Sequence, residues 1–157
     1  MSKKGKIITE LLEEFYPFLR EKLELQEDPK VVLKNNSENA QDPLGRTAHY
    51  DPDAKTISVY MSDRHPKDIL RSISHEMVHH AQNCRGDLDN VGDLGEGYAQ
   101  SDGHMRKMEL EAYQQGNIIF RDWTDERQNT KERDMKIKNN NIAMSGLGEN
   151  RKRSRRK

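Results

Sequence analysis

The segment Ser72–Gln82, SISHEMVHHAQ, constrains the fold more than any other part of the chain, because both sides of one helix must find partners. His75 and His79 are four positions apart, which places both rings on one side of a helix. Pro66 suits the first turn of such a helix, with Ser62 or Asp63 as its cap, and the helix should run to about Asn83. The opposite side is apolar, at Leu70, Ile73, Met77, Val78 and Ala81.

His75, Glu76 and His79 form an H-E-x-x-H pattern. Two imidazoles at this helical spacing can converge on one metal ion, and Zn²⁺ is the ion typical of the pattern. Glu76 follows the first histidine directly, so its carboxylate lies beside the ion and can take a proton from a metal-bound water. His80 points elsewhere on the helix and is expected to be a hydrogen-bonded or solvated structural residue. We therefore expect zinc at His75 and His79, with Glu76 as general base.

A hydrolytic zinc site needs three protein ligands and one open position. The pattern H-E-x-x-H-x-x-G-x-x-H is excluded, because Gln82 and Arg85 stand where it requires Gly and His. The remaining candidates for the third ligand are Glu109 or Glu111 in a later helix, and His104 just before them.

The helical face that carries Glu109 favours it as the third ligand. Ala112 and Gly116 share that face, and such small residues allow close packing on the zinc helix. Glu111 points to roughly the opposite side of the helix, where solvent is the expected partner. The spacing prefers Glu109 to Glu111 and leaves His104 open as an alternative.

An H-E-x-x-H helix followed by a helix with Glu-x-x-Ala resembles the minimal gluzincins, a group of metallopeptidases. "HEMVHHAQ" with "ELEAYQQGN" is especially similar to small metallopeptidases of phage and bacterial genomes, over about residues 56–122. The resemblance implies a minimal zincin-like fold and peptide or protein substrates, with zinc held by His75, His79 and Glu109. This chain departs from the pattern at Tyr113, where many relatives carry Asp or Asn.

Three further side chains are candidates to polarise the substrate carbonyl, namely Tyr113, Tyr98 and His104. His104 also supports an alternative, because "HEMVHH…DGHMRKM" is similar to SprT-like proteases, which use a third histidine and act on proteins crosslinked to DNA. A nonenzymatic zinc-binding assembly module is a further alternative. It would have no use for Glu76 as a base.

The remaining periodicities predict an α+β fold, with a small, mostly antiparallel sheet packed on the H-E-x-x-H helix and on a second, glutamate-bearing helix at about 104–120. An N-terminal helix, kinked or divided at Pro17, precedes a strand in "PKVVLKN" and a hairpin around the turn "DPDA". The second hairpin strand, Lys55–Met61, is expected to offer an edge to an extended peptide. A Gly- and Asp-rich stretch at 84–103 predicts either a functional loop or a mobile one.

Charge divides the chain into two parts, although 27 Lys and Arg balance 27 Asp and Glu overall. From Thr124 onward, eleven Lys and Arg face five Asp and Glu, a basic surplus of six, and apolar residues are few. We therefore expect a zincin-like metallopeptidase domain at 1–125 and a basic, disordered tail at 126–157. A nucleic acid or an acidic surface is the expected partner of the tail alone.

The start of the chain argues against export, because Glu10, Glu13 and Glu14 interrupt any signal-peptide core. Cys84 is the one cysteine and cannot form an internal disulfide. No apolar run reaches membrane-spanning length. These features predict a soluble cytoplasmic protein.

Overall fold

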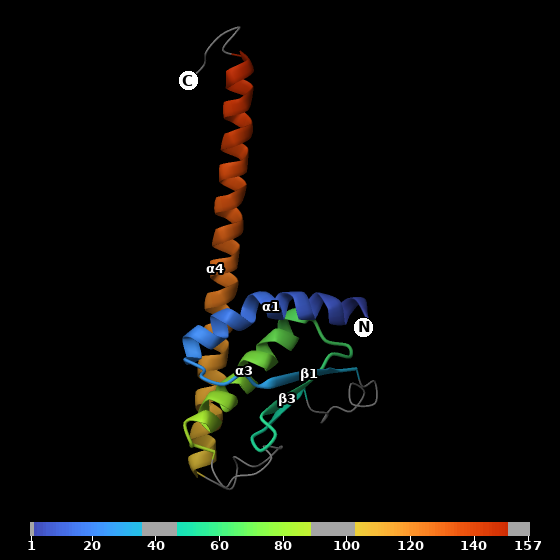
Figure 1. The fold of residues 1–157 in the computed structure, drawn as a ribbon, viewed down its shortest axis with the longest axis vertical. Helices are drawn as coiled ribbons and strands as arrows, with labels where there is room; N and C mark the ends of the chain where they lie inside the picture. The colour runs from blue at the N-terminus through green and yellow to red at the C-terminus, as the bar shows by residue number, and fades with distance from the viewer. Residues whose placement is uncertain (1, 36–46, 89–102, 151–157) are drawn as a thin grey trace. The chain divides into compact units, whose positions relative to one another are not determined.

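A computed structural model describes residues 2–35, 47–88 and 103–150, with side chains up to 142. The chain divides into two compact units, 1–121 and 122–157. Within the described ranges the fold is α+β, with helices packed on a small sheet, as the sequence predicts (Figure 1). They are α1 (Lys3–Leu23), β1 (Lys30–Lys34), β2 (Ala48–Asp51), β3 (Thr56–Tyr60), α3 (Pro66–Cys84) and α4 (Gly103–Asn150).

Helix α1 has clear start and stop signals. The Ser2 side chain caps it by accepting from the Gly5 N–H at 3.0 Å, and Glu24 ends it in the left-handed conformation with φ 52°. Pro17 lies inside the helix but does not divide it. The proline ring holds a helical φ, so the cost is confined to one lost donor and local crowding. The face toward the core carries Ile8, Phe15 and Leu19.

The sheet has the order β1-β3-β2 and is mixed rather than mostly antiparallel. The register pairs Lys30 with Thr56 in the parallel ladder and Asp51 with Thr56 in the antiparallel one. The short turn at 52–55 forces β2 and β3 to be antiparallel, as predicted, whereas no tight turn constrains the direction of β1. β3 is therefore central and bonded on both sides. The expectation that Lys55–Met61 offers a free edge is wrong, and among the residues that the structure describes the outer strands are β1 and β2.

Helix α3 matches its predicted range but not its predicted cap. Pro66 is in the first turn, and the cap is His65, whose Nδ1 accepts from the Lys67 N–H at 3.1 Å. Arg64 ties the start of the helix to β3, since it donates to the Tyr60 carbonyl at 2.9 Å and to Ser72 Oγ at 2.6 Å. The cap is therefore His65, which follows the predicted candidates Ser62 and Asp63.

The core of the first unit is built around α3, which packs against α1, β2 and β3 (Figure 1). Buried side chains converge from these elements and from the first part of α4. They include Phe15 and Leu19 of α1, Tyr50, Ile57 and Val59 of the sheet, Ile69, Ile73 and Met77 of α3, and Met105, Ala112 and Phe120 of α4. α3 therefore places its apolar side in this core, as its sequence pattern predicts.

Helix α4 continues to Asn150, beyond the predicted end near Phe120 and into the segment expected to be disordered. In the second unit, Gln128 donates to Glu132 at 3.2 Å, and the Arg127 guanidinium lies 5.6 Å from the centre of the Trp123 ring. A low apolar content argues against a core, but the Glu, Lys and Arg residues of this segment are good helix formers, and i,i+4 pairs add support to a polar helix. Within the described ranges, no helix has the length and apolar composition of a membrane span.

Candidate metal centre

Two helices of the first unit approach each other closely at Gly116. A Cβ atom on Gly116 would lie 2.9 Å from the Cα of His75, so only glycine permits this spacing. Ser74 Oγ donates to the Gly116 carbonyl at 2.7 Å and fixes the crossing. Ala112, one turn earlier on the same face, is fully buried. The small residues of α4 thus bring its Glu109 face against the histidines of α3, as their spacing predicts.

Glu109 meets both histidines of the H-E-x-x-H pattern. Its Oε1 lies 2.7 Å from His75 Nε2, and its Oε2 lies 3.1 Å from His79 Nε2. One ligand atom from each residue falls within 4.8 Å of the other two. These three residues form a group that could hold a metal ion.

The cluster is buried on one side and open on the other. The His79 side chain is 2% exposed, whereas those of His75 and Glu109 are 21% and 31% exposed. The two imidazole rings meet edge to face, with centroids 5.0 Å apart. A small ion or molecule can therefore reach His75 and Glu109 from solvent, while His79 anchors the group in the interior.

Carboxylates dominate the electrostatics of His79. Burial alone lowers its pKa, but the hydrogen bond that Glu109 accepts from His79 and the charges of Glu76 and Glu109 outweigh burial and raise it. Its other ring nitrogen, Nδ1, lies 2.8 Å from Gln82 Oε1. Without a metal, the cluster thus favours a protonated His79. A bound cation would compensate the negative charge of the same carboxylates instead.

Glu76 is buried in the interior beside this cluster, with 8% of its surface exposed. Burial raises the pKa of its carboxyl group, the charges of His79 and His75 oppose that shift, and Glu109 adds to it. Since all three members of the cluster act on Glu76, it is electrostatically coupled to them. A carboxyl group with a raised pKa next to such a cluster is suited to exchange protons.

The other predicted site residues have different surroundings. The Tyr113 ring lies edge to face against His75, with centroids 5.3 Å apart, and is 61% exposed. His104 is not in the cluster; its Nε2 lies 2.8 Å from the Asp87 carbonyl. Tyr98, most of the predicted loop at 84–103, and the basic end 151–157 lie outside the described residues.

Glu111 has protein partners, although its position on the helix predicts a solvated side chain. Its Oε1 accepts from Gln82 Nε2 at 2.7 Å and from Arg85 at 2.8 Å. Burial raises its pKa, but these two hydrogen bonds outweigh burial and lower it. Sequence reasoning missed Gln82, although its place three residues after His79 on the same helix was an available signal.

Of the candidates for the third position, the structure brings Glu109, and neither His104 nor Glu111, to the two histidines. Comparisons of the chain with protein-family models, curated proteins and solved structures each found no match. The functional interpretation of this protein therefore rests on the geometry of the cluster and the chemistry of its side chains.

Proposed function

We propose that this protein is a zinc-dependent metallopeptidase of the minimal gluzincin type. The convergence of His75, His79 and Glu109 on one point is the observation that carries the proposal. Glu109 belongs to a different helix and lies 30 and 34 positions after His79 and His75 in the sequence, yet the donor atoms of the three residues converge. Exposed acidic groups often lie together without binding a metal ion, but this group combines two imidazoles with one carboxylate and includes the buried His79.

The donor set fits zinc. Two imidazole nitrogens and one carboxylate are a known ligand set of catalytic zinc sites, which keep a further position open. Ligand atoms about 2.0–2.2 Å from a tetrahedral ion lie roughly 3.4 Å from one another. The two Glu109 oxygens lie 2.7 and 3.1 Å from the two Nε2 atoms, near this value, and one ligand atom of each residue lies within 4.8 Å of the other two. Bound zinc supplies a lowered pKa for a coordinated water and polarises a carbonyl oxygen.

Glu76 is proposed as the general base. Its buried carboxyl group sits next to two ligand residues and has a pKa raised by burial, so it can accept a proton and give it back. In peptide hydrolysis it would take the proton of the attacking water and deliver it to the leaving amine. The phenol of Tyr113, against His75, can donate a hydrogen bond to the substrate oxygen.

An extended peptide fits the fold as an added strand on an outer edge of the sheet. β3 is paired on both sides, so an added strand must pair with β1 or β2. Main-chain pairing of this kind selects for an extended backbone more than for particular side chains. Unstructured protein segments are therefore the proposed substrate class.

The proposal is tested by the substitution Glu76→Gln. Hydrolysis of an unstructured protein would be measured at equal zinc occupancy, with Glu10→Gln, an exposed glutamate of α1, as the matched control. Loss of a general base is expected to lower the rate by about 10²- to 10⁴-fold, while zinc content and helicity stay unchanged. The Glu10 variant should retain the wild-type rate.

Equal rates for wild type and Glu76→Gln would remove Glu76 from the mechanism. A wild-type protein that binds zinc but cleaves none of several unfolded proteins and peptides would favour the nonenzymatic zinc-binding module instead.

A further inference from the structure

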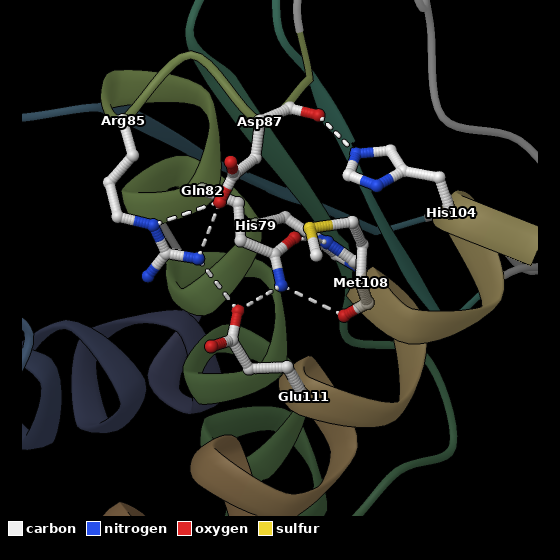
Figure 2. A network of polar contacts seen from close by, with 7 residues as sticks. All are labelled: His79, Gln82, Arg85, Asp87, His104, Met108 and Glu111. Carbon is white, nitrogen blue, oxygen red and sulfur yellow. Dashed lines mark hydrogen bonds and ion pairs between the residues drawn. The ribbon is translucent and has the colours of Figure 1, made fainter.

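Gln82 is a fully buried polar side chain beside a proposed metal ligand, and each of its polar atoms has a partner (Figure 2). Its Oε1 lies 2.8 Å from His79 Nδ1. Its Nε2 donates to the Met108 carbonyl at 2.8 Å and to Glu111 Oε1 at 2.7 Å. Gln82 therefore links α3 to α4 directly behind His79.

The orientation of the Gln82 amide is fixed by the chemistry of its neighbours. The Met108 carbonyl and the Glu111 carboxylate are acceptors only, and both face the same atom of the amide. An amide turned the other way would place its oxygen against two oxygens and lose both bonds. The nitrogen of Gln82 must face α4, so its oxygen must face His79.

This orientation determines which nitrogen of His79 carries a proton. Because Gln82 Oε1 is an acceptor, His79 Nδ1 must donate to it. The nitrogen that remains for a metal is Nε2, which is also the atom that lies 3.1 Å from Glu109. A neutral His79 in this environment is held in the tautomer and the ring orientation that a metal ligand needs.

Arg85 holds the far end of this arrangement. Its guanidinium donates to Glu111 Oε1 at 2.8 Å and to Asp87 Oδ2 at 2.8 Å (Figure 2). The positive charge keeps the Glu111 carboxylate turned toward Gln82. We call His79, Gln82, Glu111 and Arg85 the orienting network.

We propose that Gln82, held by Glu111 and Arg85, is a positioning residue that fixes the metal ligand His79, an inference that rests on the proposed zinc centre. The role proposed for this network requires no contact with the substrate. Its function is to keep the Nε2 lone pair of His79 directed at the ion. Loss of such a partner of a ligating histidine typically weakens metal binding by about 10- to 100-fold.

The test compares Gln82→Met, which keeps the volume but removes the amide, with the pair Glu111→Met and Glu111→Gln. Gln114→Met, at an exposed position of α4, is the matched control. The measurements are the Kd for Zn²⁺ by competition with a chelator, and the visible absorption spectrum of the Co²⁺-loaded protein. The spectrum reports ligand geometry, which a loss of general stability does not alter.

We expect Gln82→Met to bind Zn²⁺ about 10- to 100-fold more weakly, with an altered Co²⁺ spectrum. Glu111→Met should shift both readouts in the same direction by less. Glu111→Gln should restore them, because its amide oxygen can still accept from Gln82. Gln114→Met should match wild type. If Gln82→Met does not fold, the Glu111 pair still decides the question.

Wild-type Kd and spectrum in Gln82→Met, or in both Glu111 variants if Gln82→Met is unfolded, would overturn the inference while leaving the zinc centre intact. Failure of the wild-type protein to bind either ion would overturn the zinc centre, and this inference with it.

Discussion

His79 and His80 are neighbours on α3, both are buried, and they have opposite environments. His79 faces the carboxylate of Glu109, and its pKa is raised. About 100° further around the helix, His80 lies between Tyr50 Oη, 2.6 Å from its Nδ1, and the Glu27 carbonyl, 2.8 Å from its Nε2. Burial, the largest influence there, lowers the pKa of His80, and the bond to the Glu27 carbonyl opposes this only in part.

The contrast shows that burial does not by itself make a histidine functional. His80 has neutral partners that suit a neutral ring, since Nε2 donates to a carbonyl and Nδ1 accepts from a phenol. His79 has the carboxyl groups of Glu76 and Glu109 beside it, and their combined influence raises its pKa despite burial. Of these two histidines, His79 belongs to the group that could hold a metal ion, and His80 does not.

The largest expected effect comes from disturbing the His79 side alone. A Cβ on Gly116 would lie 2.9 Å from the His75 backbone, whereas a Cβ on Gly103 of the same helix would have nothing within 4 Å. We expect Gly116→Ala to lower the free energy of unfolding by about 1–3 kcal/mol and to weaken zinc binding, because α4 must move away from α3. Gly103→Ala should be neutral or stabilising by up to about 1 kcal/mol.

Urea unfolding and zinc titration of the two alanine variants check this prediction. Equal stability and equal zinc affinity for Gly116→Ala and Gly103→Ala would show that the close helix crossing does not support the cluster.

A smaller effect should appear in the pH dependence of stability of the metal-free protein. The folded-state pKa of His79 is raised above 6.5, so its contribution is complete below pH 6.5 and is lost as the pH rises through the folded pKa. The folded-state pKa of His80 is below 6.5, so the unfolded chain binds the proton first. Its contribution is complete above pH 6.5 and falls as the pH is lowered.

Urea unfolding of wild type, His79→Gln and His80→Gln in chelator is measured across a pH series. For each variant, the difference from wild type in the free energy of unfolding is plotted against pH, which gives two slopes. The difference between wild type and His79→Gln should shrink as the pH rises, and that between wild type and His80→Gln should shrink as the pH falls. Slopes of the same sign would contradict the contrast between the two environments.

Much of the candidate site could be predicted from sequence, because it depends on spacing within single helices. The four-residue interval placed His75 and His79 together, and the small residues Ala112 and Gly116 pointed to Glu109. The i,i+3 spacing places Gln82 beside His79, but the contact of Gln82 with Glu111 could not be predicted, since it depends on the angle at which α4 crosses α3.

The strand order and the length of α4 were also beyond sequence reasoning. Alternation of apolar residues identifies β3 as a strand but does not reveal that β1 pairs with its second edge. The low apolar content after Trp123 argues against a hydrophobic core in that segment. It does not argue against a helix, because a polar helix can be solvated on all sides, and α4 continues to Asn150.

The most direct test of the proposed zinc centre is the zinc content of His79→Ala and His80→Ala, measured by elemental analysis after dialysis against limiting zinc. We expect one zinc per chain in wild type and in folded His80→Ala, although the latter should be less stable because Tyr50 and Glu27 each lose a partner. His79→Ala should lose stoichiometric zinc. Zinc retained at one per chain in His79→Ala, or lost equally from both folded variants, would contradict a metal centre built on the His79 side of α3.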